Sequence, residues 1–479
     1  MNASHGTNGP RQEGRAEGPA RRGISRRQFV TLAGLGLASL GLAACGGGDK
    51  AAEAPVETAP ATSAAAPAAA TTSRASGVDA DYRIVSRSES KPFLYDLTGK
   101  EYPLERDDLE LMGPFAEGLA FVRWKESDYD EEWKTETNVG YSAGCVDKDG
   151  KLALDFSDII ATLPSKPSVI REDALMFNEG LLAFTCEWET EDEHQNTIHH
   201  ATSFVVDTKG KLQFSLGDNG SVADTDALGK KGTSTSGMCR YGTFFTTVAG
   251  TNESSYCIVD KTGKVVVNKK PDGWGLGNWG APFGDGLYAE RGNDDYNVYD
   301  FSGNTVLHLD IPEDSFDGYD QVPNAGSIFG EGLISINVTK LNPNKGGNDK
   351  KYVGLYDPVA KKWVYGPIGQ EITTWMGDDS FNGVFPLRFM KPLESNVVDE
   401  SEIPYPDGGY GLLRADGTWA LEPGDSRTSQ FTQGDFLTEG YMILNDGNGA
   451  YQLIHVDESG VELIDDFPST VIKAGVYTV

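Results

Sequence analysis

Short apolar runs recur along this chain and are separated by glycine-containing turns, which predicts many short β-strands and few helices. One five-residue motif, F-x-[E/D]-G-L, occurs four times, and we call each copy a strand phrase. The apolar and β-branched residues after each Gly favour a half-buried sheet, so each copy predicts the start of a strand. The clear copies centre on Gly118, Gly180, Gly286 and Gly332, and related segments on Gly242, Gly383 and Gly440.

A second pattern, two apolar residues followed by D-x-x-G-[K/N], alternates with the first. Asp at the first position of a type I turn caps the turn through its side chain, and Gly accepts the positive φ of the adjoining bulge. The pattern therefore predicts a hairpin. Clear copies begin at 94, 145, 205, 258 and 298, and weaker copies begin at 355, 412 and 455.

The spacing of the phrases predicts a repeat architecture. Successive phrase glycines lie 44 to 62 residues apart, which is room for about four short strands, the content of one propeller blade. A single blade cannot bury both faces, so we expect an all-β ring over residues 80–479. Seven strand phrases predict seven blades. The eighth hairpin leaves alternatives open: it could belong to a blade completed jointly by the two termini or to a true eighth blade, and the fold could instead be an open β-solenoid.

These phrases resemble the WG (KWG) repeats of bacterial proteins. The segments 352–357 (YVGLYD) and 410–419 (YGLLRADGTW) are similar to the second half of that repeat, with Tyr where its name-giving Trp usually stands. The resemblance covers roughly residues 90 to 465. It implies a β-rich repeat domain and no single activity.

The first 44 residues have the pattern of an export signal. Arg26, Arg27 and Phe29 follow Ser25 as in a twin-arginine motif, and an apolar stretch extends to Ala44. Leu42, Ala43 and Ala44 precede Cys45 as in a lipoprotein cleavage box. We therefore expect a lipid-modified Cys45 on the extracytoplasmic face of the cell membrane. Residues 45–79, rich in Ala, Pro and Thr, would form a disordered tether.

The net charge of the chain limits the classes of molecule that it can bind. The formal net charge is −31, and because residues 1–44 contribute six Arg against two Glu, the remainder carries −35. Such a surface repels phosphate backbones, so we expect no nucleic-acid partner. Besides the lipid bilayer, the candidate partners are a cation, a cell-surface protein or a glycan. We expect a monomer without a cofactor.

The long segments between a strand phrase and the following hairpin predict a binding rim. In a propeller they would all project from the face opposite the D-x-x-G hairpins, and three of them are acidic and contain aromatic residues. The alternative is that these loops are simply solvated. The candidate rim residues are Trp124, Asp128, Asp130, Glu131, Glu132, Trp133, Trp188, Glu191 and Glu193.

A metal site and an active site are weaker hypotheses. His194, His199 and His200 could bind a transition metal, although their spacing matches no established motif. No nucleophile elbow, HExxH, P-loop or EF-hand pattern is present. The sequence therefore favours a binding module over the alternative, an extracytoplasmic enzyme acting on cell-wall glycan at the rim.

The cysteines beyond Cys45 include no C-x-x-C pair, which argues against a thiolate zinc site. Cys145 and Cys257 stand just before equivalent turns, where a small buried residue fits a strand. We expect buried free thiols at these two positions, and the state of Cys186 and Cys239 is left open.

Overall fold

The computed structural model describes residues 80–478 except 88–91, 131–133, 172–174, 192, 196, 218–232, 236–237, 250–253, 270–279, 292–294, 312–314, 325–327, 344–348, 371, 374–382, 392–401 and 458–459. All described residues belong to the second of the chain's two units, residues 65–479. The predicted export signal with Arg26, Arg27, Phe29, Leu42 and Ala44, the lipidation site Cys45 and the tether lie outside them. No helix in the described part of the chain is long and apolar enough to span a membrane.

The described strands form eight antiparallel sheets, numbered here as blades 1 to 8 in chain order. Each is a meander of neighbouring strands, as the alternation of strand phrases and hairpins predicts. The strands are β1–β3 (Ile84–Val85, Phe93–Tyr95, Glu101–Pro103) in blade 1; β4–β7 (Glu110–Ala116, Leu119–Asp130, Thr135–Val146, Leu152–Asp155) in blade 2; β8–β11 (Val169–Ile170, Leu181–Glu191, Thr197–Asp207, Leu212–Gly217) in blade 3; β12–β15 (Thr233–Thr235, Thr243–Ala249, Ser254–Asp260, Val265–Lys269) in blade 4; β16–β19 (Gly280–Gly284, Leu287–Arg291, Asp295–Asp300, Thr305–Asp310) in blade 5; β20–β24 (Gln321–Asn324, Ile328–Gly330, Leu333–Lys340, Lys350–Asp357, Lys362–Ile368) in blade 6; β25–β28 (Ile372–Thr373, Val384–Phe389, Gly409–Arg414, Trp419–Leu421) in blade 7; and β29–β32 (Gln433–Phe436, Tyr441–Asn445, Tyr451–Asp457, Gly460–Ile464) in blade 8. Two short helices, α2 (Ser157–Ile160) and α4 (Ser469–Ala474), follow blades 2 and 8.

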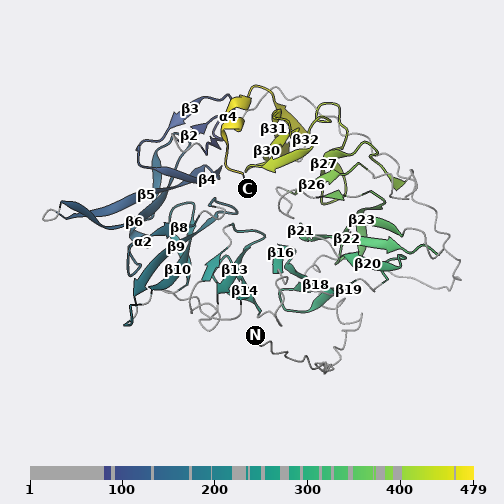
Figure 1. The fold of residues 1–479 in the computed structure, drawn as a ribbon, viewed down its shortest axis with the longest axis horizontal. Coiled ribbons are helices and arrows are strands. Elements are labelled where there is room, and N and C mark those ends of the chain that lie inside the picture. The colour runs from purple at the N-terminus through teal and green to yellow at the C-terminus, as the bar shows by residue number, and fades with distance from the viewer. Residues whose placement is uncertain are drawn as a thin grey trace, which may run out of the picture. The chain divides into compact units, whose positions relative to one another are not determined.

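Shared apolar cores join each blade to the next, which makes the molecule an all-β propeller. The sheets follow one another in chain order, and the C-terminal blade (yellow) lies beside the N-terminal strands (Figure 1). Since each sheet buries its faces against two neighbours, no blade needs a core of its own. Residues that share a buried cluster across consecutive blades include Phe121 and Phe184, Leu181 and Phe244, Ile258 and Tyr288, Val298 and Ile336, Leu355 and Phe385, Leu412 and Met442, and Leu453 and Ile84.

The two ends of the chain close the ring in blade 1. After α4, the C-terminal residues run antiparallel to β1, with Val476 bridged to Ser86. The Arg87 N–H donates to the Gly475 carbonyl at 3.0 Å, and the Tyr477 N–H donates to the Val85 carbonyl at 3.1 Å. The C-terminus thus supplies the innermost strand that blade 1 otherwise lacks.

This closure corrects the predicted blade number from seven to eight. The first two strands of blade 1 come from opposite chain ends, so no turn connects them and no strand phrase marks them. Counting the phrases therefore misses one blade, whereas all eight predicted hairpins are present. The alternative of eight blades is confirmed, and the blade that both termini complete is one of the eight.

The D-x-x-G segments form the turns between the third and fourth strands, as predicted. At Asp147, for example, the side-chain Oδ1 accepts hydrogen bonds from the Asp149 and Lys151 amides at 2.9 and 3.0 Å. Gly150 has φ +78°, and a Cβ there would collide with the Pro103 carbonyl of blade 1. Glycine is therefore required both for the turn and for close approach to the preceding blade.

The other phrase proves to be a tight hairpin between the first and second strands. Glu117 and Gly118 have φ of 51° and 81°, as a two-residue type I′ turn requires, and they connect β4 to β5. All seven phrase glycines have positive φ. The strand start predicted from the sequence is present, and the Glu-Gly pair that precedes it is the turn itself.

The acidic residue of this phrase binds the same turn in a neighbouring blade. The Glu117 carboxylate accepts from the Gly180 N–H at 3.0 Å, and the Glu179 carboxylate accepts from the Gly242 N–H at 2.9 Å. Glu439 of blade 8 accepts from the Glu117 N–H at 2.7 Å, passing over blade 1, which has no such turn. We call these contacts turn clasps; they account for the acid at Glu117, Glu179 and Glu439.

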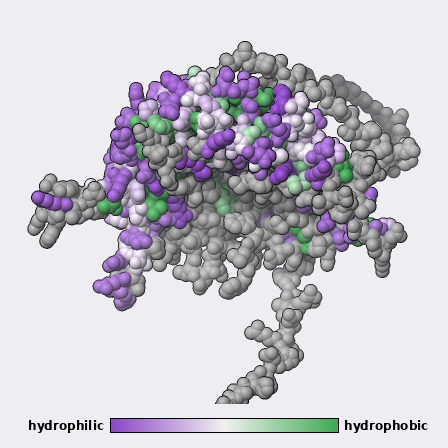
Figure 2. Space-filling model, turned by 45° about the horizontal axis from the view of Figure 1, so that its top comes forward, coloured by the Kyte–Doolittle hydropathy of each residue, from purple (hydrophilic) through white to green (hydrophobic). Residues whose placement is uncertain are grey.

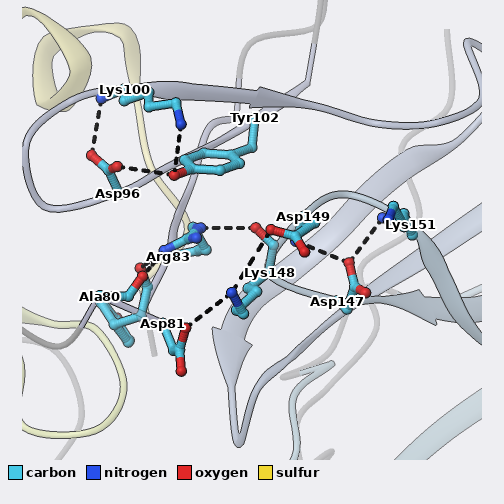
Figure 3. A network of polar contacts seen from close by, with 11 residues as sticks. Ala80, Asp81, Arg83, Asp96, Lys100, Tyr102, Asp147, Lys148, Asp149 and Lys151 are labelled. Carbon is cyan, nitrogen blue, oxygen red and sulfur yellow. Dashed lines mark hydrogen bonds and ion pairs between the residues drawn. The ribbon is translucent and has the colours of Figure 1, made fainter.

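Ring closure also depends on a buried arginine next to the first described residues. Arg83 is only 2% exposed. Its guanidinium donates to the carbonyls of Lys148, Ala80 and Tyr82 at 2.7 to 2.8 Å and lies 4.2 Å from the centre of the Tyr102 ring. Figure 3 shows how these contacts fasten residues 80–83 to a D-x-x-G turn of blade 2.

Removal of residues 475–479 tests the closure by the C-terminus. We expect a loss of about 3 kcal/mol, because the inner-strand hydrogen bonds and the burial of Val476 disappear. A thermal melt followed by circular dichroism measures the effect. Deletion of residues 478–479 alone is the control and should leave the melting temperature unchanged; equal melting temperatures for both deletions would refute the closure.

A substitution in a turn clasp tests its contribution to stability. Glu179→Ala should cost about 1–3 kcal/mol, because the Gly242 N–H loses its acceptor. Glu179→Gln keeps an acceptor oxygen and should cost less. Glu193→Ala, at the exposed tip of a hairpin, is the matched control. Urea denaturation compares the three variants, and a Glu179→Ala curve identical to that of the control would show that the clasp adds nothing.

Candidate binding face

The connections between strands divide the propeller into two faces. In an antiparallel meander, the turns after the first and third strands lie at one end of the sheet, and the hairpin after the second strand lies at the other. The turn face therefore holds the turn clasps and D-x-x-G turns. We call the opposite face the arm face, because the longest strand pairs of the described residues, β5–β6 in blade 2 and β9–β10 in blade 3, extend there.

The chain reaches the propeller on the turn face. The Tyr82 hydroxyl lies 3.1 Å from Thr438 Oγ1, next to the clasp residue Glu439, and Arg83 binds the D-x-x-G turn at Lys148. Both partners are in turns of that face. Residues 80–83 therefore attach the preceding chain to the face opposite the arms.

The arm of blade 2 comprises residues 124–143 of β5 and β6. The ladder between these strands continues to the pair Asp130↔Thr135, far beyond β4 and β7 (Figure 1). Trp124, a predicted rim residue, is 4% exposed, and its indole N–H donates to Glu126 at 3.3 Å. The Arg106 guanidinium covers its ring at 5.0 Å. Trp124 thus supports the base of the arm and does not form a ligand surface.

The arm of blade 3 comprises residues 188–200 of β9 and β10, whose ladder is regular out to Glu191↔Thr197. Figure 2 shows the two arms as separate projections whose described residues are mainly hydrophilic. Trp188 is 2% exposed and stacks on His200 with ring centres 5.3 Å apart, so it too supports the base of its arm. Alternation along β9 leaves Glu187, Glu189 and Glu191 on the other face of the strand.

The described part of the predicted rim is therefore carboxylate-rich, and its two described tryptophans are buried. Glu191 and Glu193 are exposed. Asp128 and Asp130 lie in the distal part of β5. Glu131, Glu132 and Trp133 lie outside the described residues. The described members of the predicted rim lie in the two arms. The sequence could not separate supporting from exposed side chains, because both kinds occur along the same strand.

The three candidate metal-ligating histidines occupy different places in the arm of blade 3. His199 and His200 are consecutive in β10, so they lie on opposite faces of the strand. The His200 ring contacts Thr190 Oγ1 at 2.7 Å, while His194 is exposed in the turn. The described residues contain no group of three or more His, Cys, Asp or Glu side chains suited to a metal ion.

One carboxyl on an innermost strand was not singled out by the sequence. Burial raises the pKa of Asp435 in β29, and among the described residues it is the one carboxyl with a raised pKa. The cause of this shift is burial, and the Asp435 residue is partly exposed. Nothing in the sequence marks Asp435 among the 72 acidic residues, because its burial depends on the neighbouring sheets.

The four described cysteines are free, buried thiols. This confirms the prediction for Cys145 and Cys257 and settles the state of Cys186 and Cys239. Burial raises the pKa of Cys239 to about 12, with a further increase from nearby Glu179. A thiol of this kind is protonated at neutral pH and is a poor nucleophile.

Comparisons with known proteins identify no family. No protein-family model matches the sequence, and no curated protein matches it. Similar solved structures include the β-propeller domain of the Trilobed protease from Pyrococcus furiosus, at 10% identity and TM-score 0.34 over 75% of this chain and 98% of that chain. A eukaryotic initiation factor matches at 10% identity and TM-score 0.38 over 81% and 83%, and the acylaminoacyl peptidase of Pyrococcus horikoshii at 11% and 0.32 over 60% and 44%. Scores this low carry no argument about this chain, whose fold follows from its own strand ladders.

The raised pKa of Asp435 gives a stability prediction with a definite sign. Below about pH 4 the carboxyl is protonated in both the folded and the unfolded chain; as the pH rises through the folded-state pKa, the folded protein must hold a buried charge and loses stability. Asp435→Asn stays neutral. We therefore expect this variant to melt above the wild type at pH 7 and together with it near pH 3.5.

Asp416→Asn is the control for this experiment. Hydrogen bonds from Thr418 lower the pKa of the Asp416 carboxyl, so its contribution to stability is present above about pH 4 and is lost as the pH falls through the folded-state pKa. Its replacement should therefore destabilise the protein at pH 7. An Asp435→Asn variant that melts below the wild type at pH 7 would contradict the assigned burial.

Proposed function

We propose that this protein is a lipid-anchored, extracytoplasmic binding module that presents its arm face to a cationic partner. The observation that carries the proposal is the separation of the two faces. Residues 80–83 attach the preceding chain to the turn face, while the arms of blades 2 and 3 project from the other face. A partner could therefore reach the arms without meeting the anchored side of the propeller.

The anchor in this proposal is Cys45. The residues before it resemble a twin-arginine signal that ends in a lipoprotein box. A single acyl chain binds a membrane only marginally, whereas the several chains of a bacterial lipoprotein hold it firmly. Residues 46–79 would then act as the tether, extending about 3 Å per residue where proline dominates.

Charge selects the class of partner. Residues 45–479 carry a net charge of −35, and the two arms concentrate acidic residues at positions far from the propeller core. A basic protein segment or another cationic surface would be drawn to this face, and its association would weaken with salt. A polyanionic partner would be repelled. A cell-surface protein with a basic segment fits best, ahead of a free cation or a neutral glycan.

The enzyme alternative is an extracytoplasmic hydrolase acting on cell-wall glycan. Asp435 is its best candidate acid, because burial raises the pKa of its carboxyl and a general acid needs a pKa above the ordinary carboxyl value. Glycoside hydrolysis needs a second carboxylate about 5–10 Å away. No nucleophile elbow, HExxH, P-loop or EF-hand pattern is present in the sequence to mark a catalytic site. The binding module is therefore the better proposal.

Capture from the native cell envelope tests the role of the arm face. We expect alanine substitutions of the acidic residues in 124–137 and 187–200 to abolish capture of the partner, since they remove the charge that attracts it. A matched set of alanine substitutions at exposed acidic residues of the turn face, including Asp149, is the control. Retention of every captured partner by both sets would exclude the arm face.

Cys45→Ser tests the anchor separately. We expect the variant to leave the membrane fraction for the soluble fraction or the medium, because the thioether to the lipid cannot form. Immunoblotting of fractionated cells measures the distribution. A variant that stays in the membrane fraction would exclude lipid attachment at this residue without bearing on the arm face.

A further inference from the structure

One lysine of blade 6 lies against two tyrosine rings. The Lys340 ammonium is 5.0 Å from the centre of the Tyr319 ring and 5.5 Å from the centre of the Tyr352 ring. The two ring centres are 5.3 Å apart, and their planes are inclined by 58°. A cation within about 6 Å of a ring centre is attracted by the negative face of the ring. The two rings therefore form a corner that suits an ammonium group.

A carboxylate of blade 7 adds negative charge beside these rings. The Tyr352 hydroxyl donates to both Glu402 oxygens at 3.2 Å. Burial raises the pKa of Tyr319, and the nearby charges of Asp317 and Glu402 raise it further. The Lys350 ammonium lies 3.7 Å from Glu402, a surface ion pair of a kind that binds weakly. We call Tyr319, Tyr352 and Glu402 the aromatic corner.

The aromatic corner lies on the arm face, where blade 6 meets blade 7. Tyr319 precedes β20, the first strand of blade 6, and Lys340↔Lys350 is the last pair before its β22–β23 hairpin. Glu402 lies in the connection between β26 and β27, the second and third strands of blade 7. Lys340 is exposed, and Tyr319 and Glu402 are partly exposed. The corner is therefore accessible from the arm face.

Lys340 is held in the corner only by the rings. Among the described residues, its ammonium makes no hydrogen bond and no ion pair. The Arg106 guanidinium over Trp124 differs, because two hydrogen bonds to Asp108 fix it in place. The contact of an exposed lysine with a ring is weak, so another cation can displace Lys340.

A quaternary ammonium group suits the corner better than a lysine. A lysine ammonium is strongly hydrated and must give up water to contact the ring faces. The methyl groups of a quaternary ammonium share its positive charge and donate no hydrogen bonds to water, so they contact the rings at a smaller desolvation cost. An anionic ligand would be repelled by Glu402. The chemistry of the corner thus selects a methylated cation.

We propose that the aromatic corner binds a quaternary ammonium group and that Lys340 competes with this ligand as an internal cation. The inference goes beyond the proposed function, which concerns the arms of blades 2 and 3, and shares with it only the positive charge of the ligand. Because Lys340 is tethered beside the corner, its effective concentration there is high. The ligand therefore binds with an affinity reduced by the fraction of molecules in which Lys340 occupies the corner.

The experiment compares three small ligands on the purified full-length chain. The probe is choline, which carries a trimethylammonium group. Ethanolamine has the same charge on a primary ammonium, and the third ligand is the neutral alcohol in which a carbon atom replaces the choline nitrogen. Isothermal titration calorimetry gives the dissociation constants. Both cations meet the same net charge of the protein, so a difference between them reports the contact with the rings.

We expect choline to bind about tenfold more tightly than either comparison ligand, because it alone combines the charge with methyl contacts. Lys340→Met should tighten choline binding about threefold or more, since the internal competitor is removed. Lys351→Met is the matched control: it makes the same charge change one residue before Tyr352, on the opposite face of β23, and should have little effect.

Two variants of Tyr319 locate the ligand. Tyr319→Leu removes one ring and should weaken choline binding about tenfold, whereas Tyr319→Phe keeps a ring and should retain the binding. The lysine variants leave both rings in place, so they test the corner even if Tyr319→Leu does not fold.

Each other outcome overturns the inference. Equal affinities for choline and ethanolamine would show attraction by net charge alone, and absence of choline binding would exclude the ligand class. Equal effects of Lys340→Met and Lys351→Met would show that Lys340 does not compete for the corner. A folded Tyr319→Leu variant that binds choline as the wild type does would place the ligand elsewhere. None of these results bears on the arms of blades 2 and 3, which the envelope capture experiment tests.

Discussion

A four-stranded sheet has two apolar faces and two open edges, and no blade of this protein can satisfy both alone. The faces are buried because each sheet packs between two others, so the core is continuous from blade to blade. Packing of this kind leaves a first and a last blade unless the series closes. Closure is therefore the constraint on which the remaining structure depends, and it uses both chain ends: Val476 beside Ser86 on the inner side of blade 1, and Tyr82 and Arg83 between blades 8 and 2.

The turn clasps add a directional contact to this apolar packing. A hydrophobic cluster resists separation of two blades but does little to set their exact offset, because apolar contacts have no preferred direction. A carboxylate that accepts from a defined backbone N–H fixes the position of one turn against another. Tyr241 of blade 4 stands where most copies have an acid, and its hydroxyl accepts from the Glu331 N–H of blade 6 at 3.0 Å. This contact joins two turns that are separated by blade 5.

The division into two faces explains where this fold can vary. On the turn face, a hairpin can be limited by its neighbour, as shown by the turn glycine Gly150 against Pro103. Lengthening these turns would break contacts between blades. On the arm face, a longer hairpin extends away from the core and does not disturb it, as in blades 2 and 3. The arms are therefore the natural place for a binding activity, and their acidic composition gives that activity a preference for cationic partners.

The sequence alone determined the local structure of this protein, because turn formation depends on residues close together in the chain. The capping Asp and the left-handed Gly of the five clear D-x-x-G hairpins could be identified without coordinates, and with them the repeat and the all-β class. The blade number was decided only by the tertiary structure, because the innermost strand of blade 1 comes from the far end of the chain. Tertiary packing also decided that Trp124 and Trp188 are buried at the bases of the arms, that Glu117 and Glu179 clasp neighbouring turns, and that Asp435 has a raised pKa. Each of these properties belongs to a contact between residues of different blades, and no local pattern in the sequence encodes such a contact.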